Sequence, residues 1–324
     1  MTIHHSHVLS TGSYLPDNIV TNIDLEKKVD TTDEWIYSRT GIRERRVAAE
    51  NQLTSDLAFE AALKAIESAN INAEDIDLLI VATTTPDLVF PSTACLVQER
   101  LGIRNCPAFD IQAVCAGFVY ALDVADKFIK TGSATRALVI GAETFSRIID
   151  WSDRNTCVLF GDGAGAVILE QSEQPGIVSS VLHADGRYAD LLCVPVGVSK
   201  DYSKVLQGQA YTTMQGGEVF KVAVKKLGES IDELISLNNL NYDDIDWMVP
   251  HQANIRIINA MAKKLNLSKE KVIVTIDKHG NTSAASIPLA LDVGIRDGRI
   301  KRGQKLIIEG FGGGFTWGGA LINY

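Results

Sequence analysis

Short apolar runs alternate with longer amphipathic segments along most of the chain. The segment 57–70, LAFEAALKAIESAN, has the apolar spacing of a helix, and 76–84, IDLLIVATT, is a short apolar run typical of a buried strand. This alternation predicts an α/β protein. Several predicted helices, including 115–130, are apolar on most of their surface, which indicates burial on more than one side. Two sheets that enclose shared helices would bury them in this way.

The two halves of the chain match each other at an almost constant offset. Three pairs of short segments occur in the same order, 168 or 169 residues apart. The pairs are DID at 75–77 and 244–246, ALDV at 121–124 and 290–293, and RALVIGAE at 136–143 with QKLIIEGF at 304–311. Each half also closes on a Gly-rich stretch followed by an apolar run. The repeat predicts two similar halves, 1–172 and 173–324.

Composition narrows the class of protein. A chain of 324 residues with 46% hydrophobic content can form two domains, or one two-lobed domain, with an ample core. Its apolar runs are too short to span a membrane, and residues 1–12 lack the features of a signal peptide. The net charge of −9 argues against general binding to nucleic acid or to anionic membranes.

The five cysteines form an odd set without a C-x-x-C pair. This argues against a disulfide framework and against a structural zinc site. We therefore expect a cytoplasmic protein that holds no metal.

Cys115 stands where the predicted strand 108–112 meets the helix that follows it. A helix N-terminus has free N–H groups and a partial positive charge, and both favour the nucleophilic thiolate. Ala116 and Gly117 would let a substrate approach closely. At the duplicated position the residue is Ala284, so one half carries a thiol and the other does not. The alternative role for Cys115 is that of a small buried hydrophobe.

Polar residues stand at similar junctions in the second half. His251 follows the predicted strand IDWMV, and Asn281 lies between Gly280 and small residues, at the junction that corresponds to that of Cys115. If pseudo-symmetry relates the halves, these Cys, His and Asn side chains converge on one pocket. His279 is the second histidine candidate, although beside a glycine it could equally cap a turn.

Three consecutive glycines, 312–314, follow the predicted strand that ends the repeated segment. Glycine permits positive φ and exposes backbone N–H groups, which can hold a developing oxyanion. A tight turn before the last strand is the alternative, and both roles are compatible.

Together these residues resemble the β-ketoacyl-acyl-carrier-protein synthase III family of the thiolase-like superfamily. The similarity extends over essentially the whole chain. Its most specific motifs are DTTDEWIYSRTGIRERR (30–46), FPSTACLVQERLG (90–102), AVCAGFVYAL (113–122), DRNTCVLFGDGAGA (153–166), GGEVFKVAV (216–224), PHQANIRI (250–257), HGNTSAASIPLAL (279–291) and FGGGFTWG (311–318). The resemblance implies a thiolase-like five-layered αβαβα sandwich of two duplicated halves, and a homodimer.

The resemblance also implies an activity. Family members are acyltransferases that condense a short acyl-CoA, here expected to be acetyl-CoA, with malonyl-acyl-carrier protein. The decarboxylative Claisen condensation gives 3-oxoacyl-acyl-carrier protein, coenzyme A and CO₂, and it initiates fatty acid synthesis. No cofactor is expected, because the acyl-CoA is itself a substrate.

Each matching residue takes a role from the same resemblance. Cys115 matches the acyl-accepting nucleophile, and His251 and Asn281 match the pair that drives decarboxylation. The backbone N–H groups of Cys115 and Gly313 match the oxyanion hole, and Phe90 matches a residue that caps the acyl pocket of the dimer partner. Seven residues match the coenzyme A tunnel: Thr31, Trp35, Arg39, Arg154, Gly216, Phe220 and Asn254. In two departures, Asn155 stands where a glycine is common, and 190–209 matches no family pattern.

An acidic carrier protein would need a local basic face on this acidic chain. Arg256 and Lys263 are seven residues apart in one predicted helix and therefore share a face, with Lys264 adjacent. Lys221 begins an i,i+4 pair of lysines in another helix. An ordinary solvated surface is the alternative for the lysines, whereas for Arg256, close to Asn254, we expect a role in docking.

Other functions stay open at this point. GDGAGA at 161–166 looks like a dinucleotide-binding loop, but it runs into an apolar strand and not into a helix. A cysteine hydrolase with Cys115 and His251 would release free acid, and a non-catalytic scaffold would not need the Cys, His and Asn set. Within the family, a synthase for a specialised quinolone or polyketide precursor also fits.

Overall fold

The computed structural model describes residues 4–324, and the first half of the chain forms a five-stranded sheet. The strand order is β1 (His5–Tyr14), β7 (Gly163–Ser172), β6 (Arg136–Glu143), β4 (Leu78–Ala82) and β5 (Ala108–Ile111). β4 is parallel to β5 and β6, whereas β7 is antiparallel to β6 and β1. Every residue of β4 is buried, as its continuous apolar run predicted.

The second half of the chain forms a four-stranded sheet. Its order is β11 (Trp247–Pro250), β12 (Lys305–Gly312), β13 (Thr316–Asn323) and β8 (Ile177–Ala184). These strands take the same places as β4, β6, β7 and β1 in the first sheet, so the duplication is visible in the topology. We propose the boundary between the halves 1–172 and 173–324 in the short connection between β7 and β8.

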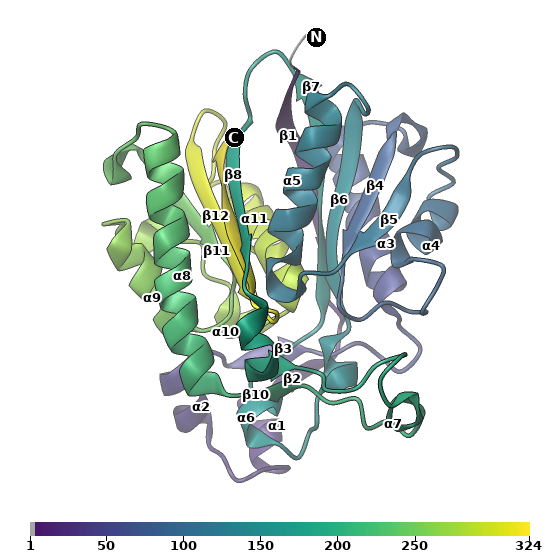
Figure 1. Cartoon of the computed structure of the whole chain (residues 1–324), viewed down its shortest axis with the longest axis vertical. Coiled ribbons are helices and arrows are strands. Elements are labelled where there is room, and N and C mark those ends of the chain that lie inside the picture. The colour runs from purple at the N-terminus through teal and green to yellow at the C-terminus, as the bar shows by residue number, and fades with distance from the viewer. Residues whose placement is uncertain (1–3) are drawn as a thin grey trace.

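Helices form three layers around the two sheets, as Figure 1 shows. The central layer is α5 (Gly117–Lys130) and α11 (Ser286–Arg296). The outer face of the first sheet is covered by α3 (Thr54–Ala69) and α4 (Thr93–Arg100). The outer face of the second sheet is covered by α8 (Gly216–Leu237) and α9 (Ile255–Lys264). The expected αβαβα sandwich is therefore confirmed. Within residues 4–324, no helix has the length and apolar character that crossing a membrane requires.

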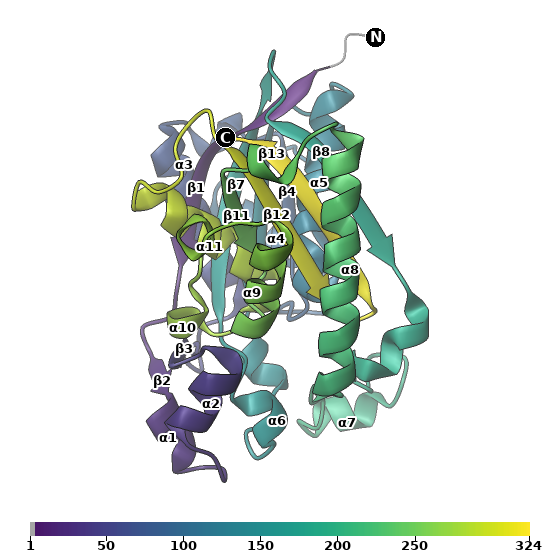
Figure 2. The ribbon, with the colours of Figure 1, turned by 90° about the vertical axis from the view of Figure 1, so that its left-hand side faces the viewer.

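The shorter elements gather mostly at one end of the molecule (Figure 2). They are β2 (Ile19–Thr21), α1 (Asn22–Glu26), α2 (Asp33–Thr40), β3 (Glu44–Arg46), α6 (Arg154–Cys157), β9 (Leu192–Cys193), α7 (Tyr202–Leu206), β10 (Thr213–Met214) and α10 (Ile276–His279). The segment GDGAGA leads directly into β7, so the structure lacks the strand-to-helix turn that a dinucleotide-binding loop needs at 161–166.

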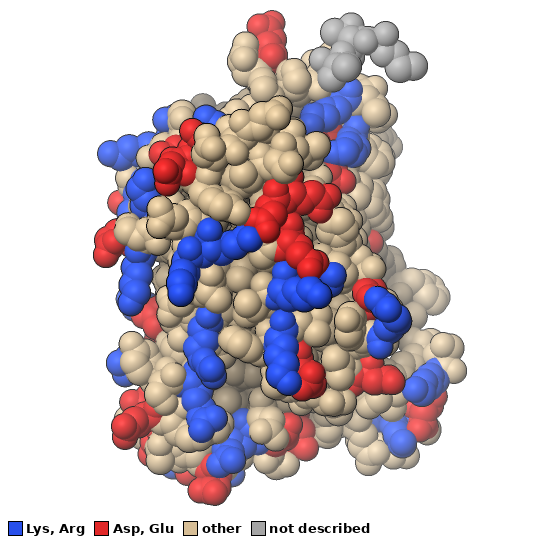
Figure 3. Space-filling view, turned by 60° about the vertical axis from the view of Figure 1, so that its left-hand side comes forward, with Lys and Arg blue, Asp and Glu red and all other residues tan. Residues whose placement is uncertain are grey.

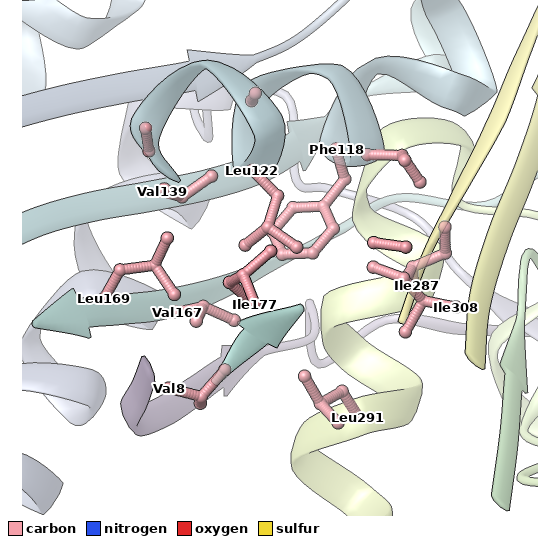
Figure 4. Close-up of a cluster of buried hydrophobic side chains, with 14 of the residues drawn as sticks. Val8, Phe118, Leu122, Val139, Val167, Leu169, Ile177, Ile287, Leu291 and Ile308 are labelled. Atoms are coloured by element: carbon pink, nitrogen blue, oxygen red, sulfur yellow. The ribbon is translucent and has the colours of Figure 1, made fainter. Parts of the chain in front are cut away.

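The space between the two sheets is filled by apolar side chains (Figure 4). Phe118 and Leu122 of α5 pack with Ile287 and Leu291 of α11 and with Ile308 of β12. All five side chains are at most 1% exposed. Burying each of them stabilises the fold by about 1.5–3 kcal/mol. Because sheets cover both sides of this layer, α5 and α11 are apolar around most of their surface.

Candidate active site

A cavity of about 450 Å³ lies between α8, α9 and the second sheet and reaches Cys115. Both halves of the chain contribute to its wall. Of the residues predicted from the sequence, the wall contains Trp35, Arg39, Cys115, Gly216, Phe220, His251, Asn254, Arg256 and Asn281. The structure thus brings the predicted nucleophile and its two predicted partners into one cavity.

Cys115 lies in a short 3-10 helix, Val114–Ala116, that separates β5 from α5. The sequence predicted Cys115 as the first residue of the long helix, but α5 begins two residues later, at Gly117. Val114 has a φ of +49°, and Ser283, its counterpart in the other half, also has a φ of +49°. A residue with a side chain adopts this conformation at a cost of about 1–3 kcal/mol, and such strain is concentrated at functional sites.

Two glycines of β12 allow the backbone of Cys115 to pack directly on the second sheet. A Cβ atom on Gly312 would lie 2.6 Å from the Cys115 nitrogen, and one on Gly310 would lie 3.1 Å from its oxygen. Among the glycines 312–314 only Gly314 has a positive φ, of +132°. Close approach and not left-handed backbone is therefore the reason for glycine at position 312.

Gly313 belongs to the turn between β12 and β13. Thr316 Oγ1 donates to the carbonyl oxygens of Ala113, at 2.8 Å, and of Gly313, at 3.3 Å. This side chain ties the turn to the segment that precedes Cys115. The turn predicted as an alternative is present, next to the backbone of the predicted nucleophile.

The thiol of Cys115 is fully buried, and burial raises its pKa to about 12. The Ser283 hydroxyl, 3.5 Å from Sγ, acts in the opposite direction but is the weaker influence. The sequence predicted that the helix N-terminus favours the thiolate, whereas burial of the sulfur acts against the thiolate and raises the pKa.

His251 follows β11, as predicted, and its backbone N–H donates to the Glu309 carbonyl oxygen at 2.8 Å. Its ring Nδ1 lies 2.5 Å from the Ser286 hydroxyl, which also accepts the Gln252 N–H. Burial lowers the pKa of His251 to about 3, so the ring is neutral at pH 7. With the Ser286 hydroxyl as donor to Nδ1, the ring hydrogen is on Nε2 and can be given to a ligand.

Asn281 is held by three hydrogen bonds. Its N–H donates to the Leu159 oxygen at 2.8 Å, and its carbonyl oxygen accepts the Gly161 N–H at 3.0 Å. Its side-chain Oδ1 accepts the Ser283 N–H at 2.9 Å, which leaves the amide NH₂ as the free end. The element before Asn281 is the short helix α10, not the strand that the sequence predicted. His279 ends α10 and is not among the residues that line the cavity.

The mouth of the cavity combines an aromatic ring with cationic groups. The guanidinium groups of Arg39 and Arg154 lie 4.8 and 4.9 Å from the centre of the Trp35 ring. The Asn254 side chain donates to the Arg39 carbonyl oxygen at 3.0 Å, which connects α9 to α2. Such a mouth suits a ligand with an aromatic base and phosphate groups. Of the predicted tunnel residues, Thr31 and Arg154 lie outside the wall itself, whereas the unusual Asn155 is part of it.

The predicted docking residues differ in their surroundings. Lys221 pairs with Glu218 at 2.8 Å, and Lys264 with Asp232 at 2.5 Å. Figure 3 shows acidic side chains interspersed with basic ones on this side of the molecule. The Arg256 guanidinium instead lies 5.1 Å from the ring of Phe220, in the cavity wall. The other predicted residues on the surface are Lys263, which is exposed, and Phe90, which is 83% exposed just before α4.

Sequence reasoning missed three polar residues around the predicted catalytic set. They are Ser283, Ser286 and Glu309. Glu309 could have been noticed, since it is the only charged residue in the apolar run LIIEGF. The two serines carry no comparable signal, because serine is common beside glycine and alanine. Within the described residues, no group of three or more His, Cys, Asp and Glu side chains is arranged to hold a metal.

Comparison with known proteins relates this chain to one family. The family model described as 3-oxoacyl-[acyl-carrier-protein (ACP)] synthase III matches residues 109–186, and the model of its C-terminal part matches 235–324. A β-ketoacyl-[acyl-carrier-protein] synthase III from Thioalkalivibrio sulfidiphilus is 62% identical over 99% of both chains, and one from Xanthomonas campestris pv. campestris is 58% identical over 99% of this chain and 98% of its own.

Solved structures agree with this relationship. The crystal structure of 3-oxoacyl-[acyl-carrier-protein] synthase III from Aquifex aeolicus has a TM-score of 0.93 at 49% identity, covering 98% of this chain and all of its own. The priming β-ketosynthase of the R1128 polyketide pathway has a TM-score of 0.94 at 34% identity and covers 99% of this chain and 96% of its own.

Proposed function

Because the chain belongs to the β-ketoacyl-[acyl-carrier-protein] synthase III family, we propose that Cys115, His251 and Asn281 carry out its reaction in two steps. The chain is an acyltransferase of the initiating condensation of fatty acid synthesis. The observation that carries the proposed roles is the single buried cavity that the three side chains share.

In the first step the sulfur of Cys115 attacks the thioester of an acyl-CoA. The C–S bond to coenzyme A breaks, and the thiol proton ends on the departing coenzyme A sulfur. The backbone N–H groups of Cys115 and Gly313 hold the oxyanion that forms at the carbonyl. The acyl group then waits on Cys115 as a thioester, which gives ping-pong kinetics. The acyl donor that we propose is acetyl-CoA.

In the second step malonyl-acyl-carrier protein occupies the same cavity. Its C–C bond to the carboxylate breaks, CO₂ leaves, and the electron pair forms an enolate on the thioester oxygen. His251, through its Nε2–H group, and Asn281, through its amide NH₂, are the donors to that oxygen. Both groups are neutral, so neither brings a negative charge that would repel the malonyl carboxylate. The enolate carbon attacks the acyl carbonyl on Cys115, and the C–S bond to Cys115 breaks. 3-Oxoacyl-acyl-carrier protein is released, and the Cys115 thiolate takes up a proton from solvent.

The remaining assignments extend this proposal to the ligands. The Trp35, Arg39 and Arg154 group receives the nucleotide end of coenzyme A. Thr31, Gly216 and Phe220 surround the pantetheine arm, and Asn254 also lines that route. No cofactor takes part, since the thiol, the two side-chain donors and the backbone N–H groups account for each step.

The proposed partners are a second copy of the chain and an acidic carrier protein, in the cytoplasm. Phe90 is exposed in the single chain and would cap the acyl pocket of the partner. Arg256, in the cavity wall, is the main residue of the proposed docking face, which also includes Lys221, Lys263 and Lys264. A specialised polyketide or quinolone synthase is not favoured, because relatives at 57 to 62% identity over almost their whole length are named β-ketoacyl-[acyl-carrier-protein] synthase III.

The test is intact-mass measurement after incubation with acetyl-CoA, with Cys115→Ser as the control. We expect an acetyl adduct that maps to Cys115 and disappears when malonyl-acyl-carrier protein is added, with formation of a 3-oxoacyl product. An adduct that forms only with longer or aromatic acyl-CoA would indicate a specialised synthase. Steady release of free acid without a condensed product would support a hydrolase and contradict the proposal.

A further inference from the structure

One carboxyl group in the cavity has no hydrogen-bond partner. Glu309 lies on β12 and is 1% exposed, and within residues 4–324 neither of its side-chain oxygens contacts a donor. The same residue lines the cavity together with Cys115, His251 and Asn281. A buried polar group without a partner costs free energy, so its retention in a substrate cavity indicates a partner that comes with the substrate.

The register of the second sheet places this carboxyl group beside His251. Glu309 pairs with Pro250, the residue before His251, and on its other side with Gly319. A Cβ atom on Gly319 would lie 3.7 Å from the Cβ of Glu309 and 3.0 Å from Leu234 of α8. The Glu309 side chain is therefore on the face of the sheet that α8 covers, where the cavity is.

The surroundings of Glu309 are apolar and contain no nearby charge. From α8 the cavity wall receives Ala223 and Leu227, and from α9 Ile257 and Ile258, together with the exposed Arg256. The other titratable groups of the wall are the neutral Cys115 and His251, and Arg39 at the mouth. Burial alone raises the pKa of Glu309 to about 8, with no charged group contributing. At pH 7 the side chain is mostly a neutral acid with one O–H donor.

The two substrates differ in what they can offer to this donor. Both carry a thioester on a phosphopantetheine arm, but only the malonyl substrate carries a carboxylate. A hydrogen bond to an ionised acceptor is about twice as strong as one between neutral groups. The donor in the cavity therefore matches the second substrate better than the first.

We propose that Glu309, as a neutral carboxylic acid, donates a hydrogen bond to the carboxylate of the malonyl substrate and orients it for decarboxylation. This inference rests on the condensation proposed above. The proton stays on Glu309 throughout, the C–C bond breaks, CO₂ leaves, and the electron pair moves to the enolate that His251 and Asn281 hold. An ionised Glu309 would repel the malonyl carboxylate, so its neutrality is part of the role.

The experiment measures the two half-reactions separately in Glu309→Leu and Glu309→Gln. Acetylation is followed by release of coenzyme A, and condensation by adding malonyl-acyl-carrier protein to enzyme that is already acetylated. Leu removes the donor, and we expect condensation to fall about ten- to a hundredfold, mainly through a higher KM, while acetylation changes less than threefold. Gln keeps a neutral donor and should recover most of that loss.

A pH series tests the same inference without relying on the Leu variant. In the unchanged protein, condensation by acetylated enzyme should decline as pH rises through about 8, because Glu309 ionises. In Glu309→Gln that decline should disappear. Equal losses in both half-reactions, unchanged condensation in Glu309→Leu, or the same decline in Glu309→Gln would each overturn the inference. If the unchanged protein forms no acetyl adduct or no condensed product, the proposed function itself has failed, and the two failures are thus distinct.

Discussion

Asn281→Ala should slow condensation strongly while leaving acetylation of Cys115 nearly intact. The proposed roles divide the donors between the steps, since the amide NH₂ of Asn281 serves the malonyl enolate. The backbone N–H groups of Cys115 and Gly313 serve the acyl carbonyl instead. Removal of Asn281 therefore tests the division itself and not only whether the residue matters.

The structure sets the expected size of this effect. Loss of one oxyanion donor costs about 2.7–4 kcal/mol of transition-state stabilisation, which lowers the condensation rate about 10²–10³-fold. Alanine keeps the backbone bonds of position 281 to Leu159 and Gly161. It also leaves the Ser283 N–H without its acceptor, which lowers the free energy of unfolding by about 1–3 kcal/mol. The site should therefore be retained in a somewhat less stable protein.

Asn281→Asp is the matched control for this loss of stability. Its carboxylate can still accept the Ser283 N–H, but it replaces the NH₂ donor with an oxygen that repels the enolate and the malonyl group. We expect condensation at least as slow as in the alanine variant, although the Ser283 N–H keeps its acceptor. The Asp variant thus separates catalysis from folding.

The assay is a single turnover with enzyme that has been acetylated beforehand. Quenched samples report the 3-oxoacyl product after malonyl-acyl-carrier protein is added, and intact mass reports the acetylation rate in a parallel series. Condensation within threefold of the unchanged protein would refute the role of the amide. A parallel fall in acetylation would show that Asn281 acts on the whole cavity and not on the enolate.

Three further predictions follow from other parts of the structure. Arg256→Glu should raise the KM for malonyl-acyl-carrier protein about tenfold and change acetylation less, since the inserted carboxylate repels an acidic partner; equal effects on both substrates would contradict docking at this residue. Because the pKa of Cys115 is raised to about 12, the thiolate fraction grows tenfold per pH unit between pH 6 and 9. The logarithm of the acetylation rate should therefore rise with a slope near one over this range. A plateau near pH 7 would mean that substrate binding lowers this pKa. Gly141→Ala should lower the free energy of unfolding by about 1–3 kcal/mol, because its Cβ would lie 2.3 Å from a backbone oxygen of the segment before α11. As the control, Gly228→Ala on α8 places its Cβ in open space and should be neutral or slightly stabilising in the same thermal unfolding experiment.

Much of the fold could be predicted because the signals are local and repeated. DID, ALDV and the paired apolar strands mark the same elements in both halves, and the two sheets have the same strand order. The all-round apolar character of α5 and α11 required a layer between two sheets, which is where both helices lie. By contrast, the 3-10 helix at Val114–Ala116 depends on a positive φ at a β-branched residue, which no local propensity favours.

The details of the site escaped prediction because they depend on contacts between distant segments. Ser286 meets His251 across 35 positions in the sequence, and Ser283 meets Cys115 across 168. The raised pKa of the thiol could not be predicted for the same reason, since desolvation depends on residues that are distant in the sequence. What surrounds the sulfur decides its protonation, and that wall comes from both halves of the chain.

The duplicated junctions show how the two halves divide the chemistry. Val114 and Ser283 have the same positive φ at equivalent positions, so the strained backbone is common to both halves. The residue that follows differs: Cys115 in one half and Ala284 in the other. Ala284 is 1% exposed and is not part of the cavity wall, so the thiol that we propose as the nucleophile comes from the first half alone. The second half contributes His251 and Asn281 to the same wall, and the proposed reaction therefore needs both halves.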